Sequence, residues 1–155
     1  MNEQQEIKKI LEHFFDGKEA HASFDQVVKG VKKKNYNSKI EGIPYTLWQL
    51  LEHIRLTQKD IIAYIEDPNY VEKNWPDDYW PKEQKDIDDK MWQESVDSYK
   101  QDLKKLKEIM HKSDLFEKLG NEKKHRLIRE LFLVQVHTSY HLGEMVTLRR
   151  LLNKW

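Results

Sequence analysis

The chain has 155 residues, with 27 Lys and Arg against 27 Asp and Glu, and no cysteine. This length suits a single domain over residues 1–155, and the zero formal net charge argues against a nucleic-acid partner, which usually needs a positive excess to neutralise phosphates. The absence of thiols excludes disulfides, thiolate zinc sites and a cysteine nucleophile.

The first half of the chain is expected to be helical, because its apolar residues recur with a helical period. One helix is predicted over residues 2–16, ending before a glycine. A short helix is predicted over residues 24–31, and a long one from residue 46 to 65. Each of these two begins with a capping box, in which a Ser or Thr stands three residues before a Gln.

The second half is predicted to contain one long loop and two long helices. Residues 66–85 have no helical period and hold three prolines together with Trp75, Tyr79 and Trp80. So many aromatic residues indicate an ordered loop that covers the bundle. Helices are predicted over residues 86–112 and 122–153. The expected fold class is therefore all-α, a four-helix bundle with a long aromatic-rich loop between its second and third long helices.

A membrane partner is not expected. The chain has no run of 18 apolar residues, and its first residues, MNEQQEIKKILEHFF, lack a continuous apolar stretch. We therefore expect a cytoplasmic protein.

The segment VQVHTSYHLGEMV, residues 134–146, is the strongest functional signal. Four residues advance a helix by about 400°, so His137 and His141 lie about 40° apart on one face and can bind one ion. His141 falls within the apolar stripe, and Glu144 lies at its edge beside His137. The alternative is two histidines that serve packing beside a solvated glutamate.

A metal site needs at least a third ligand, and the residues alone leave His13, His21 and His53 as candidates. His53 has the best position, at the margin of the apolar stripe of its helix. His111 and His125 are predicted at helix ends among lysines, where histidines usually serve the helix dipole or solvent.

Four segments of the chain resemble the DinB-like (damage-inducible) four-helix metalloprotein family in order and spacing. They are AHASF at 20–24, PYTLWQLLEHIRLTQKDI at 44–61, WPDDYWP at 75–81 and HTSYHLGEMVTLRRLLNKW at 137–155. The resemblance implies that His53, His137 and His141 bind one divalent metal and that His21 lies near the site. This chain has Val136 where the family often has an acidic residue, which leaves all three ligands in place.

The resemblance also implies a function and an oligomeric state. Some relatives of the family are metal-dependent thiol S-transferases, so the implied substrate is a small molecule, specifically a low-molecular-weight thiol, and a homodimer is expected. Three imidazoles suit Zn²⁺ or Ni²⁺, with Fe²⁺, Co²⁺ or Cu²⁺ as alternatives.

Glu144 is the candidate catalytic residue, as a general base, and it is also a candidate fourth ligand or a supporting carboxylate. Three further functions stay open: a hydrolase using metal-activated water, a non-catalytic metal-binding or stress-associated module, and a bundle without metal. A zinc peptidase is disfavoured because Thr138 stands where the H-E-x-x-H motif has its glutamate. The pair Arg149 and Arg150 is a candidate site for an anionic substrate group, or a solvated helix end.

Overall fold

The computed structural model describes residues 2–18, 20–82, 84–119, 124–152 and 155, and within these ranges the fold is all-helical. The α-helices are α1 (Glu3–Phe15), α2 (Phe24–Val28), α3 (Lys33–Tyr36), α4 (Leu47–Glu66), α5 (Asp89–Lys112) and α6 (Leu127–Leu151), with a 3₁₀ turn η1 (Asp77–Tyr79). Extended pairing in the described ranges is limited to one isolated bridge between Lys118 and Arg126. The all-α prediction is confirmed for this part of the chain.

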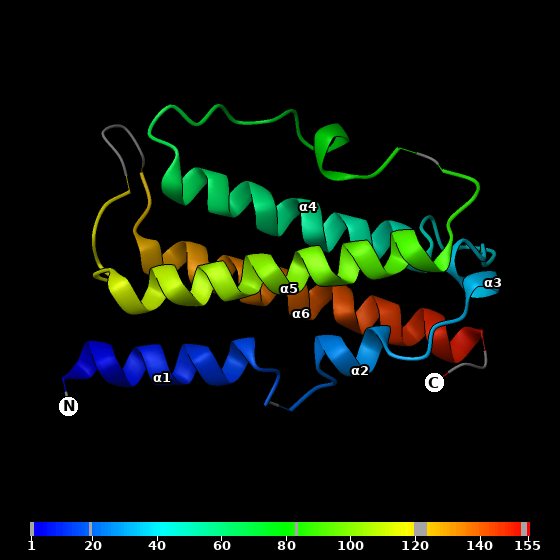
Figure 1. Cartoon of the computed structure of the whole chain (residues 1–155), viewed down its shortest axis with the longest axis horizontal. Helices are drawn as coiled ribbons and strands as arrows, with labels where there is room; N and C mark the ends of the chain where they lie inside the picture. The colour runs from blue at the N-terminus through cyan, green and yellow to red at the C-terminus, as the bar shows by residue number, and fades with distance from the viewer. Residues whose placement is uncertain (1, 19, 83, 120–123, 153–154) are drawn as a thin grey trace.

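The long helices pack side by side. Helix α4 lies against both α5 and α6, while α1 and α2 follow one another along the opposite side, where both contact α6 (Figure 1). The segment that follows α4 runs back along this helix and includes η1 (Figure 1). None of the described helices is long and apolar enough to cross a lipid bilayer.

Capping residues set where the helices begin. Ser23 and Thr46 each accept a hydrogen bond from the backbone N–H of the glutamine three residues later, and that glutamine bonds back, so both predicted capping boxes are present. Asn2 and Gln5 form a third capping box at the start of α1. Asp88 caps α5, so this helix begins at residue 89, three residues after its predicted start.

Helices α2 and α6 are also shorter than predicted. Helix α2 ends at Val28, not at residue 31, and Gly30 then takes a left-handed backbone with φ of 72°. Helix α6 begins at Leu127, not at residue 122, because Arg126 takes an extended backbone and pairs with Lys118. Residues 122–123 of the predicted start and residue 153 of the predicted end lie outside the described residues.

The core consists of two apolar clusters, which take different halves of the long helices. One holds Leu142, Met145 and Leu148 of α6 with residues of α2 and of the first half of α4. The other holds the first half of α6 with Leu11 and Phe15 of α1 and the second half of α4. The part of α6 between these two sets contains residues 137–141, so a polar layer divides the core.

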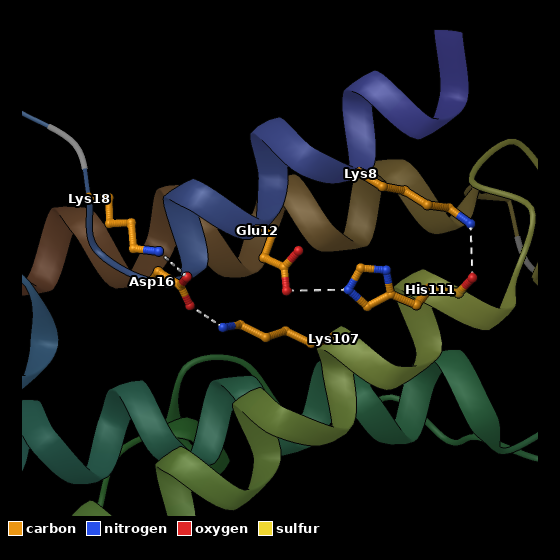
Figure 2. A network of polar contacts seen from close by, with 6 residues as sticks. All are labelled: Lys8, Glu12, Asp16, Lys18, Lys107 and His111. Atoms are coloured by element: carbon orange, nitrogen blue, oxygen red, sulfur yellow. Dashed lines mark hydrogen bonds and ion pairs between the residues drawn. The ribbon is translucent and has the colours of Figure 1, made fainter. Parts of the chain in front are cut away.

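Polar contacts fasten α1 to α5 at the surface (Figure 2). Lys8 donates to the His111 carbonyl at 3.2 Å, His111 faces Glu12 through its ring at 3.4 Å, and Asp16 pairs with Lys107. Lys8 also donates to the Ser113 carbonyl at 2.7 Å. Exposed pairs of this kind contribute about 0–1 kcal/mol each, so the buried Leu11 and Phe15 account for most of the docking of α1.

Thr46→Ala should lower the free energy of unfolding by about 1–2 kcal/mol, because the N–H of Gln49 loses its cap in a buried position. Urea unfolding measures this. Thr147→Ala makes the same substitution at an exposed position within α6 and should change stability by less than about 0.5 kcal/mol. Equal effects of the two substitutions would contradict the capping role.

Candidate metal centre

Three histidines meet where α4 packs against α6. His53 lies in the second turn of α4 and is 1% exposed, while His137 and His141 lie on adjacent turns of α6. One ring nitrogen from each residue falls within 4.8 Å of the other two, and in the described ranges these three residues form the group able to hold a metal ion. The predicted ligands are therefore brought together.

The separation of the nitrogens fits metal coordination. Nε2 of His53 lies 3.1 Å from Nε2 of His137. Two imidazoles on a tetrahedral zinc, each about 2.0–2.1 Å from the ion, have their nitrogens about 3.3 Å apart. The three ring centroids lie 4.5–4.9 Å from one another, so the rings surround a common point. The donor set therefore fits a divalent ion.

The outer nitrogens of two of these rings are held by hydrogen bonds. Nδ1 of His53 donates to the carbonyl oxygen of Tyr79 at 2.7 Å. Nδ1 of His141 donates to Oε2 of Glu144 at 2.6 Å. Because each Nδ1 carries the proton, the Nε2 lone pairs of both rings are available as ligands.

Burial favours the neutral form of two of these imidazoles, those of His137 and His53. It lowers the pKa of His137 to about 3, with further contributions from His141 and His53. It also lowers the pKa of His53, against the opposing effect of the hydrogen bond to the Tyr79 carbonyl. A metal competes with protons for imidazole, so neutral rings at physiological pH are ready to bind.

Glu144 lies outside the triad. One carboxylate oxygen accepts from His141 and the other accepts from the hydroxyl of Tyr45. The hydrogen bond to Glu144, followed by burial, raises the pKa of Tyr45 to about 12, so this hydroxyl stays protonated and donates. The geometry favours a supporting carboxylate that orients His141, and the role of Glu144 as a general base stays a prediction.

The aromatic residues of the long loop take different positions. The ring of Trp80 stacks on His53, with centroids 3.9 Å apart and planes 3° from parallel. Tyr79 is buried and supplies the carbonyl that holds His53, whereas Trp75 is 69% exposed. Trp80 thus covers one face of a ligand ring. His137 is the partly exposed member of the triad, so a molecule from solvent would reach the site beside His137.

The other candidate histidines lie elsewhere. Nε2 of His21 is 3.1 Å from the hydroxyl of Ser139, His13 is exposed on α1, and His111 faces Glu12. Nδ1 of His125 lies 3.0 Å from the buried carboxylate of Glu130. None of these four joins the triad in the described part of the chain.

The arginine pair does not form an anion site through Arg149. This side chain is buried, and its guanidinium donates to the backbone carbonyls of Gln26 and Val27, which attaches α2 to α6. Burial lowers the pKa of Arg149.

Two functional contributions were missed from the sequence. The hydroxyl of Tyr45 comes from the residue before the Thr46 cap, and the capping box could have predicted that it lies beside the start of α4. The carbonyl of Tyr79 leaves no signal in the sequence, because every residue has one.

Comparison with known proteins gives no family: no family model, no curated protein and no solved structure matches the chain.

Elemental analysis of untagged protein should find about one equivalent of a divalent metal in the wild type after incubation with Zn²⁺ or Ni²⁺. His137→Ala and His141→Ala each remove one of three ligands and should retain much less. His111→Ala removes an exposed imidazole outside the triad and should keep the wild-type content. Equal metal content in all four proteins, or none in the wild type, would contradict the site.

Proposed function

We propose that this chain is a divalent-metal-binding protein of the DinB-like four-helix type, with one ion held by His53, His137 and His141. The observation that carries the proposal is the convergence of three imidazoles, two of them fixed through Nδ1 by Tyr79 and Glu144. Packing alone does not require three imidazoles around one point, since apolar side chains would fill the same space at lower cost. The four quoted sequence segments support the family.

We further propose an enzyme, a metal-dependent thiol S-transferase. A divalent ion held by three imidazoles, with a coordination position left open, would lower the pKa of a small thiol. His53 and His141 would hold that ion through Nε2, and Glu144 would offset part of its charge through His141. Trp80 shields His53 from water. The thiol comes from a cosubstrate, because the chain has no cysteine.

Two other functions rest on the same ligands. In a hydrolase, water takes the place of the thiol and Glu144 acts as general base. In a non-catalytic module, the ion serves binding alone. The transferase is preferred because both oxygens of Glu144 already have hydrogen-bond partners, which favours orienting His141 over taking a proton from water. The proposed ion is Zn²⁺ or Ni²⁺. The proposed oligomeric state is a homodimer.

The transferase is tested by incubating metal-loaded protein with a low-molecular-weight thiol and a chloro-aromatic acceptor. A carbon–sulfur bond forms, chloride leaves, and the thiol proton passes to solvent. Turnover should require the metal and should be lost in His137→Ala, while His111→Ala should keep it. If several thiols give no turnover with Zn²⁺, Ni²⁺, Co²⁺, Fe²⁺ or Cu²⁺, the transferase is wrong and the binding module remains.

Glu144→Gln separates the two roles of this carboxylate. As a supporting group it orients His141, so its replacement should weaken metal affinity by about 10–100-fold. As a general base it would leave affinity unchanged and remove only hydrolytic activity. Competition with a chromogenic chelator measures the affinity.

Tyr45→Phe is the matched control for this substitution. It removes the second partner of the carboxylate and leaves the bond between Glu144 and His141, so its affinity should stay closer to that of the wild type. A wild-type metal affinity in Glu144→Gln would contradict the role of Glu144 in orienting His141.

A further inference from the structure

A cavity lies away from the metal-binding triad, between the last turns of α4, the first turns of α6 and the segment after α4. Its volume is about 940 Å³. This is in the range of small-molecule sites, which run from roughly 300 to 1,000 Å³. Asp60 and Tyr64 of α4 line it, together with Tyr70 and Tyr79 of the segment and Glu130 of α6.

Asp60 is the unusual group in this cavity. The residue is 6% exposed, and its Oδ2 accepts two hydrogen bonds, from the hydroxyls of Tyr70 and Tyr79, each at 2.9 Å. Its Oδ1 accepts none from the described residues. Burial raises the pKa of both tyrosines, so their hydroxyls stay protonated and donate. The carboxylate thus keeps one acceptor oxygen for a cation.

Lys73 shows what kind of cation this position takes. Its ammonium nitrogen lies 3.4 Å from Oδ1 of Asp60 and 5.9 Å from the centroid of the Tyr79 ring. A carboxylate beside a tyrosine face is the environment that attracts an ammonium ion. Yet the Lys73 side chain is 41% exposed and belongs to an irregular segment, so its replacement exposes little buried surface.

The tyrosines add an apolar wall next to this position. The rings of Tyr64 and Tyr70 meet nearly at right angles, 83°, with centroids 5.3 Å apart. Ile61 and Leu133 also line the cavity. A ligand with a hydrocarbon or aromatic body beside its charge can therefore bury that body here.

The opposite wall does not favour an anionic ligand. Glu130 is buried and takes the guanidinium of Arg129 on both oxygens, at 3.0 and 3.1 Å, as well as Nδ1 of His125 at 3.0 Å. The charges of Arg129 and Glu130 therefore offset each other. Lys124 also lines the cavity but is exposed. An incoming anion would meet the buried carboxylate of Asp60 at close range.

We propose that this cavity binds an organic ammonium ion, a primary amine with an apolar body. The ammonium group takes the place of Lys73 against Oδ1 of Asp60 and the face of Tyr79, and the body lies along Tyr64 and Tyr70. Lys73 acts as a built-in competitor, which lowers the apparent affinity by the fraction of molecules in which it occupies the position.

The test uses metal-free protein, so it does not depend on the histidine triad. The probe is 2-phenylethylammonium chloride, compared at constant ionic strength with 2-phenylethanol, which keeps the aromatic body and lacks the charge. Calorimetric titration and the shifts of backbone amide NMR signals near Tyr64, Tyr70 and Tyr79 give affinity and location. The ammonium ion should bind at least about tenfold more tightly than the alcohol.

Lys73→Ala removes the competitor and should raise the affinity for the ammonium probe by about tenfold, corresponding to a position that Lys73 fills in about nine molecules of ten. A misfolded variant would not gain affinity, so this result does not depend on unchanged stability. Lys105→Ala, which breaks an exposed ion pair with Glu66 outside the cavity lining, should leave the affinity unchanged.

Asp60→Asn is nearly isosteric and should abolish the preference of the site for the ammonium ion over the alcohol in the Lys73→Ala background. Equal binding of the two probes to Lys73→Ala, or no binding of either, would overturn the proposal and leave Asp60 as an anchor for the segment after α4. Ammonium binding whose NMR shifts fall outside the cavity would overturn it as well.

Discussion

The structure depends on three imidazoles that meet between α4 and α6. These rings are tolerated there because their polar atoms have partners: the Tyr79 carbonyl, the Glu144 carboxylate and one another. These contacts fix the register of α4 against α6, since a shift of one residue would turn His137 and His141 by about 100° away from His53. The position of the segment after α4 follows, because it must deliver the carbonyl of Tyr79.

This polar layer is costly, and the two apolar clusters offset the cost from either side. On α6 one cluster ends at Val134 and the other begins at Leu142. Between them lie the polar residues His137, Thr138 and His141, of which the last two are buried. On α4 the corresponding gap holds Thr57 and Gln58, both buried, each with an oxygen that accepts no hydrogen bond from the described residues. Folded proteins retain buried polar groups of this kind mainly where function needs them.

Local chemistry was enough to predict most helix starts and the pair on α6. Ser23, Thr46 and their glutamines act within one turn, and His137 and His141 share a face by helical geometry alone. Local rules could not select His53 over His13 or His21, because the third ligand depends on which helices pack together. The predicted start of α6 was wrong for the same reason, since the pairing of Arg126 with Lys118 is not local in the sequence.

Tyr79 connects the metal centre with the cavity at Asp60. Tyr79 holds His53 through its carbonyl and Asp60 through its hydroxyl, at 2.7 and 2.9 Å. If an amine at Asp60 shifted Tyr79, it would also shift the hydrogen bond that orients a metal ligand. Linkage makes such an effect reciprocal, so an ion at the triad would change amine affinity by the same factor. The segment after α4 lines the cavity and also contacts His53, so each ligand would in that case change the affinity of the other.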